Sequence, residues 1–175
     1  TILRQMFSCR MTILGDRAQT IDQEPRDVLK FLPSIFGRDI RRIEMKKSYR
    51  NTTEIAAYAS QILGITDLEL YERHGKPVET KHVSSFEKAL ACALASLDLS
   101  GRYETAAILL PCADDAAAVY GQLKNHPAFQ MPDGMTLSLL DRNSIHFRKG
   151  LTVTTYYLAK GLEFDQVFGI FPADD

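Results

Sequence analysis

Short apolar runs alternate along the chain with amphipathic segments, and this alternation constrains the fold more than any other feature. The clearest run, Thr105–Leu110 (TAAILL), is apolar almost throughout, which is typical of a strand in a parallel sheet covered on both faces. An amphipathic segment over residues 114–125 follows it and opens with two aspartates, which suit the positive end of a helix dipole. Strands and helices that alternate in this way predict an α/β fold, a three-layer sandwich with a mainly parallel sheet.

Another helix is predicted over residues 51–63. Asn51 is expected to cap it, and Glu54 stands at the third helical position, as in a capping box. Gly64 is expected to end it. The apolar side chains of this segment recur at helical spacing and are therefore expected to face a core; they are Ile55, Tyr58, Ala59 and Ile62.

Two more helices and five more strands complete the expected pattern. Ser84 and Glu87 form a capping box before a helix over 86–97. A helix over 25–36 starts at a proline, contains Pro33, which would kink or split it, and ends at Gly37. Strands are also predicted over residues 11–14, 40–46, 135–140, 151–155 and 166–171.

The composition agrees with a globular domain and excludes several other classes. The 175 residues are 45% hydrophobic and 25% charged, close to globular averages and unlike disordered or coiled-coil chains. No apolar run approaches the roughly 20 residues that a bilayer span needs, so we expect no membrane partner. A net charge of −1 excludes a protein that coats polyanions generally. Residues 38–50 nevertheless hold a local surplus, with six basic and two acidic side chains.

The cysteines and the first residues indicate the cellular compartment of the protein. Cys9, Cys92 and Cys112 form no CxxC pair and show no metal-ligand spacing, which predicts buried free thiols and no metal site. Free thiols suit a cytoplasmic protein. The sequence opens with Thr1 rather than an initiator methionine and shows no charged leader before an apolar stretch. We therefore expect a piece of a longer cytoplasmic protein.

Ligands of parallel sheets bind outside the carboxyl ends of the strands, so polar residues just after predicted strands are the candidate site residues. After residues 11–14, Gln19 offers a neutral amide that can bridge a phosphate oxygen and an attacking water. An ordinary turn is the simpler interpretation of that segment alone. After residues 40–46, Arg50 offers fixed donors for a phosphate and Tyr49 a flat face for a base. The alternative there is a solvated basic edge.

The segment 154–165 (TTYYLAKGLEFD) lies between two predicted strands and is the most specific of the three. Lys160 supplies a cation, and Gly161 a backbone position that a ligand can approach closely. Glu163 can accept a hydrogen bond from a ribose hydroxyl. These three segments carry the chemistry expected of the chain.

Taken in order, the three segments resemble motifs III, IV and V of superfamily 1 helicases of the UvrD/Rep type. LGDRAQTI is similar to the family's GDxxQSI, KKSYRNTTEI to its NYRS-containing motif, and TTYYLAKGLEF to its THxxKGLEF. The YYLAKGLEFD form resembles the HelD or helicase IV branch most. The resemblance covers most of the chain. It implies that residues 1–37 are the tail of a first RecA-like motor domain and residues 38–175 a second one, of P-loop NTPase type without its own P-loop, truncated before motif VI.

The resemblance also implies a role for each matching residue. Gln19 matches the glutamine that senses the γ-phosphate, and Arg50 the arginine finger that reaches across the cleft between two motor domains. Tyr49 matches the tyrosine that stacks on adenine. Gly161 and Glu163 match positions near the triphosphate and the sugar. The segment that couples ATP to single-stranded DNA is matched by Thr155, Tyr157 and Lys160.

Two departures from the family's pattern concern the contacts with DNA. Tyr157 stands where the family has a histidine, and residues 22–25 (DQEP) lack the aromatic side chains that the family uses to stack on bases. A further absence concerns ATP. No GxxxxGK[ST] phosphate loop occurs in the chain, so the ligands of the Mg²⁺ that accompanies ATP are expected in the missing first motor domain.

The sequence therefore predicts part of an ATP-dependent DNA helicase or translocase of 3′→5′ polarity, acting on single-stranded and duplex DNA in repair or recombination. The cofactor is ATP with Mg²⁺. The chain alone is expected to be inactive, because it holds one side of the ATP cleft. One alternative is a HelD-like, ATP-driven remodeller of RNA polymerase. Another is a degenerate RecA-like module that serves only as an interaction domain.

Overall fold

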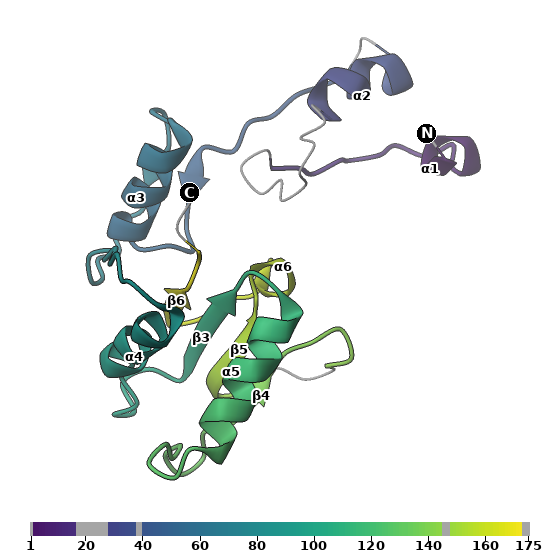
Figure 1. Cartoon of the computed structure of the whole chain (residues 1–175). Helices are drawn as coiled ribbons and strands as arrows, with labels where there is room; N and C mark the ends of the chain where they lie inside the picture. The colour runs from purple at the N-terminus through teal and green to yellow at the C-terminus, as the bar shows by residue number, and fades with distance from the viewer. Residues whose placement is uncertain (1, 17–27, 38–39, 145–147, 173–175) are drawn as a thin grey trace. The chain divides into compact units, whose positions relative to one another are not determined.

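The computed structural model describes residues 2–16, 28–37, 40–144 and 148–172. The chain divides into two compact units, Thr1–Glu79 and Thr80–Asp175. Within the described residues each unit holds helices and a parallel sheet, of two strands in the first and four in the second (Figure 1). None of the helices in these described ranges has the length and apolar character needed to cross a membrane. The boundary between residues 37 and 38, which the resemblance implies between a first and a second motor domain, stays a prediction.

The sheet of the second unit has the strand order β4-β5-β3-β6, with every neighbouring pair parallel. Its central strands, β3 (Thr105–Leu110) and β5 (Gly150–Thr155), pair along their whole length. The edge strands are β4 (Thr136–Leu139) and β6 (Gln166–Gly169). All four strands predicted for this part of the chain are present, so the prediction of an α/β fold with a parallel sheet is confirmed. The third layer of the sandwich stays a prediction.

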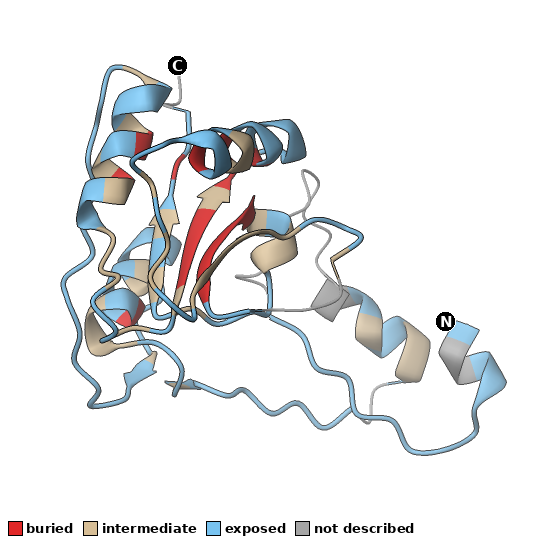
Figure 2. Cartoon of the chain, turned by 90° about the horizontal axis from the view of Figure 1, so that it is seen from below, coloured by how far each residue is buried: buried red, intermediate tan, exposed pale blue. Residues whose placement is uncertain are grey.

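One apolar core joins this sheet to α4 (Phe86–Ser96) and α5 (Ala113–Asn125). Figure 2 shows the buried residues concentrated on the strands and on the inner sides of helices. Ile108 of β3 and Val153 of β5 are partners in the register and are both buried. Each buried side chain of this size stabilises the fold by about 1.5–3 kcal/mol. The core consists of Leu90, Ala93, Ala106, Ile108, Leu110, Ala116, Val119, Leu123, Leu151, Val153 and Ile170.

The cap of α4 lies one residue from its predicted position. Ser85, not Ser84, accepts the capping hydrogen bond from the Lys88 N–H, at 3.3 Å. The Ser84 hydroxyl instead accepts from Lys88 Nζ at 2.9 Å. Two adjacent serines offer the same acceptor, and the backbone conformation decides which of them serves.

The cysteines are less buried than the sequence predicted. Cys9 and Cys112 are exposed and Cys92 is half-buried, so the prediction of buried thiols is wrong. Cys112 has a structural reason to lie at the surface: it is the N-cap of α5, and its Sγ accepts from the Asp115 N–H at 3.4 Å. A helix start leaves its first N–H groups without backbone partners, and the thiol satisfies one of them. Asp115 also lies in the first turn, where the predicted complement to the helix dipole is confirmed.

Gly150 begins β5 where no other residue fits. Its φ is +118°, and an added Cβ would lie 2.2 Å from the carbonyl oxygen and 2.5 Å from the nitrogen of Thr136 on β4. Close pairing of β4 and β5 therefore depends on the missing side chain.

The first unit has two parallel strands and three helices in its described residues. α2 runs unbroken through Pro33 and ends as predicted at Gly37, whose N–H donates to the Pro33 carbonyl at 3.0 Å. Its predicted start, residues 25–27, lies outside the described residues. α3 ends as predicted at Gly64. The elements are α1 (Ile2–Met6), α2 (Val28–Phe36), β1 (Lys47–Ser48), α3 (Thr53–Leu63) and β2 (Glu69–Leu70).

Two strands predicted for this unit are wrong. Residues 11–14 form a short apolar run and residues 40–46 contain two isoleucines, but within the described part of the chain neither segment pairs with a strand. A strand needs such a partner to satisfy its backbone groups. Pairing begins at Lys47, where β2 lies alongside. Leu14 is consequently 81% exposed.

Two details of α3 also differ from the prediction. Its N-cap is Thr52 rather than Asn51, and the Thr52 hydroxyl accepts from the Ile55 N–H at 3.4 Å. The expected core-facing side chains Ile55, Tyr58 and Ile62 are exposed, and Ile62 by 66%. Helical periodicity predicts that an apolar face exists, but it does not show what covers that face.

Candidate functional site

In the first unit, candidate residue Tyr49 directly follows β1 and lies beside Tyr71, which directly follows β2. The register pairs Ser48 with Leu70, so the two tyrosines leave their parallel strands at the same level. Their ring centroids are 5.7 Å apart and the ring planes are tilted by 45°. Lys47 Nζ lies 5.5 Å from the Tyr49 centroid and 6.0 Å from the Tyr71 centroid, within the range of cation–π attraction.

A hollow of about 370 Å³ opens beside these side chains and is lined by Lys47, Leu70, Tyr71 and Glu72. Small-molecule sites have volumes of about 300–1,000 Å³, so the hollow is large enough for part of a ligand. Its lining combines a cation, a carboxylate, an aromatic ring and an aliphatic side chain. A ligand that has both a flat apolar part and hydrogen-bonding groups matches this combination.

The first residue of α3 holds the segment that carries Tyr71. Thr53 Oγ1 donates to the Tyr71 carbonyl at 2.9 Å, and the Thr53 N–H donates to the Arg73 carbonyl at 2.8 Å. β2 is in turn joined to the residue before β1, because the Glu69 N–H donates to the Lys46 carbonyl at 2.8 Å. Tyr71 is thus fixed by its backbone from two elements.

Glu54 extends this anchoring and does not close the capping box that the sequence predicted. Its Oε2 accepts from the Gly75 N–H at 2.8 Å, and its Oε1 lies 2.9 Å from His74 Nδ1. These bonds, led by that from Gly75, lower the pKa of Glu54 from 4.5 to about 2. The ionised carboxylate therefore ties the 74–75 turn to the first turn of α3.

Arg50 is exposed between the end of β1 and Thr52, the N-cap of α3. This is the position beside a helix N-terminus that its sequence context predicted. Gln19, the other predicted catalytic residue, lies outside the described residues.

Part of the basic surplus over residues 38–50 is balanced locally. Lys46 Nζ and Asp67 Oδ2 are 2.5 Å apart, and this contact raises the pKa of Lys46 and lowers that of Asp67. Arg42 forms an ion pair with Glu44. The pair with Asp67 joins residues far apart in sequence, so counting charges within the segment alone misses it.

In the second unit, Thr155 joins β5 to the short helix α6 (Tyr156–Ala159). Thr155 is 6% exposed, and its hydroxyl accepts from the Leu158 N–H at 3.3 Å, so its side chain caps the helix. Lys160 follows the last residue of the helix and is exposed. Whether these two residues contact DNA stays a prediction.

Gly161 and Glu163 lie in the exposed turn that follows α6. Gly161 has φ of +89°, a conformation that other residues rarely adopt, although an added Cβ would meet no atom within 4 Å. The backbone, rather than crowding, explains the glycine.

Asp165 fastens the end of this segment to the start of β3. One oxygen, Oδ2, accepts from the Glu104 N–H at 3.0 Å and from the N–H and hydroxyl of Thr105, each at 2.9 Å. The Thr105 hydroxyl also lies 3.0 Å from the Asp165 nitrogen. The last residue of the TTYYLAKGLEFD segment therefore sets its position against the sheet.

Tyr157 belongs to an aromatic cluster near the carboxyl ends of β5 and β6. Its ring stacks on that of Tyr156, with centroids 4.5 Å apart, and the Tyr156 centroid lies 6.2 Å from that of Phe171. Tyr157 is 49% exposed and Phe171 59%. The cluster offers flat apolar surface to solvent at the edge of the sheet where ligands of parallel sheets bind.

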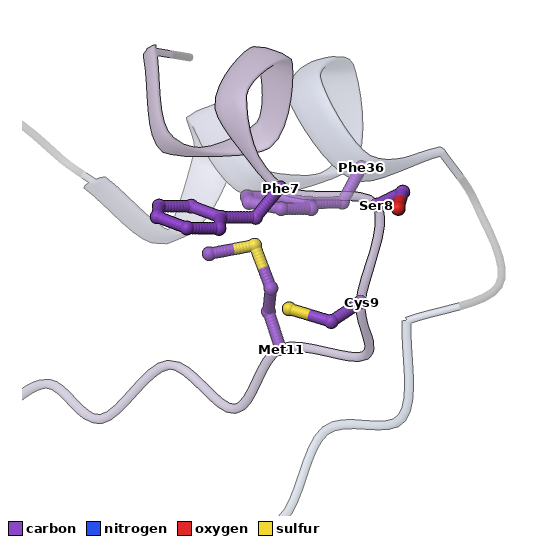
Figure 3. A pocket seen from close by; sticks show the side chains of 5 residues that line it. All are labelled: Phe7, Ser8, Cys9, Met11 and Phe36. Atoms are coloured by element: carbon purple, nitrogen blue, oxygen red, sulfur yellow. The ribbon is translucent and has the colours of Figure 1, made fainter.

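A separate hollow of about 400 Å³ lies in the first unit, away from the predicted site residues in sequence. Figure 3 shows the side chains of Phe7, Phe36, Met11 and Cys9 around it. Ser8 also lines it, and the described part of the lining contains no charged side chain.

The candidate residues that the structure describes thus form two groups, one in each unit. Tyr49 and Arg50 lie in the first, and Thr155, Tyr157, Lys160, Gly161 and Glu163 in the second. Among the described residues no three His, Cys, Asp or Glu side chains are grouped so that they could hold a metal ion. No family model, curated protein or solved structure matches the chain.

Sequence reasoning missed Lys47 and Tyr71 in the first group, and Tyr156 and Phe171 in the second. A signal existed for Lys47 and Tyr156, since each lies within a segment singled out for its motif. For Tyr71 and Phe171 only strand pairing shows the connection.

Proposed function

We propose that the chain is the second motor domain, with the end of the first, of an ATP-dependent DNA helicase or translocase of the UvrD/Rep type. In this proposal Arg50 is the arginine finger and Gln19 positions the attacking water. Tyr49, Gly161 and Glu163 bind the nucleotide, and Thr155, Tyr157 and Lys160 contact single-stranded DNA. The Mg²⁺ of the nucleotide is held by the first motor domain, which also supplies the phosphate loop.

The observation that supports this proposal most is where the motif residues lie relative to the parallel strands. Tyr49 directly follows β1, and the segment from Thr155 to Glu163 begins at the last residue of β5. Both are carboxyl ends of parallel strands, which is where α/β sheets bind nucleotides. The parallel sheet of the second unit is compatible with a RecA-like fold.

An arginine finger acts by stabilising the charge of the transferred phosphoryl group, so its loss costs turnover and not folding. In a parent protein that contains both motor domains, Arg50→Ala is expected to lower DNA-stimulated ATPase activity about 10³- to 10⁵-fold. Arg41→Ala is the matched control, an exposed arginine of the same basic segment, and should keep wild-type activity. Circular dichroism of both variants checks that the fold is retained. Wild-type turnover in Arg50→Ala would refute the assignment.

The 175-residue chain by itself provides a second test. We expect it to hydrolyse no ATP with or without single-stranded DNA, because it supplies one side of the cleft and no phosphate loop. DNA-stimulated hydrolysis by the purified chain would contradict this division of the site.

A further inference from the structure

The pairing of β1 with β2 brings Tyr71 beside Lys47 and Tyr49, a contact that no motif indicates. Lys47 pairs with Glu69 and Ser48 with Leu70, so the next level along both strands holds Tyr49 and Tyr71. Side chains alternate along a strand, which places Lys47 and Tyr49 on one face. The ring separation of 5.7 Å and the position of Lys47 Nζ near both rings agree with this placement.

Both rings keep a large area open to a ligand. Tyr49 is 63% exposed and Tyr71 46%. Tyr71 also lines the 370 Å³ hollow together with Lys47, Leu70 and Glu72. An aromatic ring held beside a cation and a carboxylate offers stacking, a donor and an acceptor within one small volume.

We propose that Tyr71, Lys47 and Glu72 bind a purine nucleoside triphosphate, Tyr71 and Glu72 at its nucleoside and Lys47 at its phosphates. Tyr71 contributes a second aromatic surface beside Tyr49, Glu72 accepts from a hydroxyl or amino group of the nucleoside, and Lys47 attracts the phosphates. The inference rests on the proposed function, which supplies the triphosphate, and it adds three binding residues to which the motif resemblance assigns no role.

The charges around the hollow favour a single nucleotide over a nucleic-acid strand. Glu72 lines the hollow and Glu69 pairs with Lys47 in the adjacent strand. A strand of DNA carries a phosphate at every nucleotide and would bring several of them past these two carboxylates. A nucleoside has neutral donors for a carboxylate, and its phosphates all extend from one end, toward a cation.

The backbone of Tyr71 is held well enough to keep its ring in place. Its carbonyl accepts from Thr53 Oγ1 at 2.9 Å and from the Arg73 N–H at 2.7 Å. Two residues beyond Arg73, Gly75 is bound by Glu54. Such anchoring reduces the freedom that the ring would lose when a base stacks on it.

The test is a titration of the 175-residue chain with Mg²⁺-ATP, in which ligand-observed NMR measures binding. A second titration uses inorganic triphosphate, a probe that lacks the nucleoside. Tyr71→Leu is expected to weaken ATP binding about tenfold, within the range measured for base–aromatic stacking, and to leave triphosphate binding unchanged. Tyr71→Phe should bind ATP as the wild type does. Lys47→Gln should weaken both probes, and less so at high salt.

Tyr58→Leu is the matched control, because Tyr58 is an exposed tyrosine of α3 in the same unit, and it should leave both affinities unchanged. Failure of the wild-type chain to bind ATP overturns the inference. Equal ATP affinity in Tyr71→Leu and wild type overturns it too, as does an equal loss for both probes, which would indicate structural damage. If Tyr71→Leu weakened the binding of a single-stranded oligonucleotide but not the binding of ATP, the hollow would bind nucleic acid and the proposed ligand would be wrong.

The inference and the proposed function fail in different ways. ATP binding that ignores Tyr71, with Arg50-dependent hydrolysis in the parent protein, would refute the inference alone. ATP binding that depends on Tyr71, without any hydrolysis in the parent protein, would refute the helicase proposal alone.

Discussion

Replacing Gly150 by alanine tests whether the close pairing of β4 and β5 depends on a missing side chain. The new Cβ would lie 2.2 Å from the Thr136 carbonyl oxygen, 2.5 Å from its nitrogen and 2.9 Å from its carbonyl carbon. All three atoms are backbone, so no side-chain rotation relieves the overlap, and β4 must move away. The φ of +118° adds strain of its own for any residue with a Cβ.

The expected loss of stability has three contributions: backbone strain, a weakened hydrogen bond and the overlap itself. Backbone strain in a sparsely populated region is of order 1–3 kcal/mol. Moving β4 also weakens the hydrogen bond from the Thr136 N–H to the Lys149 carbonyl, 3.0 Å long, at about 0.5–1.5 kcal/mol. With the overlap added, we expect Gly150→Ala to destabilise the second unit by about 3–5 kcal/mol. That is a large share of the 5–15 kcal/mol typical of a whole domain.

The assay is urea denaturation of the chain, followed by far-ultraviolet circular dichroism. At an m-value of about 2 kcal/mol per molar, the expected loss lowers the midpoint by about 2 M. Gly121→Ala is the matched control: Gly121 lies inside α5, and an added Cβ meets no atom within 4 Å. It should stabilise the helix by about 0.5–1 kcal/mol, with the opposite sign. A Gly150→Ala midpoint within 0.3 M (roughly the precision of such fits) of wild type would refute the reasoning.

Three further predictions concern side chains that accept hydrogen bonds from the backbone. Cys112→Ser should keep or raise stability by a few tenths of a kcal/mol and Cys112→Val should lower it by about 1 kcal/mol, because α5 needs an acceptor at its N-cap; thermal melts of both variants check this. The depressed pKa of Glu54 means that its bond to the Gly75 N–H is fully present above about pH 4.5 and is lost as pH falls through about 2. Protection of the Gly75 amide from hydrogen exchange, corrected for intrinsic rates, should fall over that window in wild type and not in Glu54→Gln. Asp165→Ala should cost about 1–2 kcal/mol of unfolding free energy, since it leaves two N–H groups at the start of β3 to water; an unchanged urea midpoint would contradict this.

Much of the secondary structure of the second unit could be predicted from the sequence, because each of its main elements corresponds to one continuous segment with a clear pattern. Thr105–Leu110 is a continuous apolar run, and its predicted ends are those of β3. The helix that follows differs by one residue at its start, because the thiol of Cys112 serves as the cap. Such segments form the same element wherever they pack, so propensity and burial agree.

The first unit could be predicted less well because its elements depend on partners distant in the chain. Residues 40–46 contain two β-branched isoleucines and suit a strand, but the strand forms only at Lys47–Ser48, where Glu69–Leu70 lies alongside. Likewise, Glu54 has the spacing of a capping box, but its carboxylate binds Gly75, twenty-one residues further on. The spacing of residues in the sequence identifies a side chain that can form a hydrogen bond, but it does not identify the group to which that side chain binds.

The candidate site likewise has residues that neighbouring sequence identifies and residues that only a distant partner brings into place. Tyr49 and Arg50 could be singled out because a strand, a polar motif and a helix start follow one another within a few residues. Tyr71 could not, because its connection to Tyr49 exists only through the two-residue pairing of β1 with β2. A shift of that register by one residue would turn Tyr71 to the opposite face of its strand and separate the rings. The proposed nucleoside site therefore depends on strand register as much as on residue type, and disrupting the pairing should weaken ATP binding even with both tyrosines present.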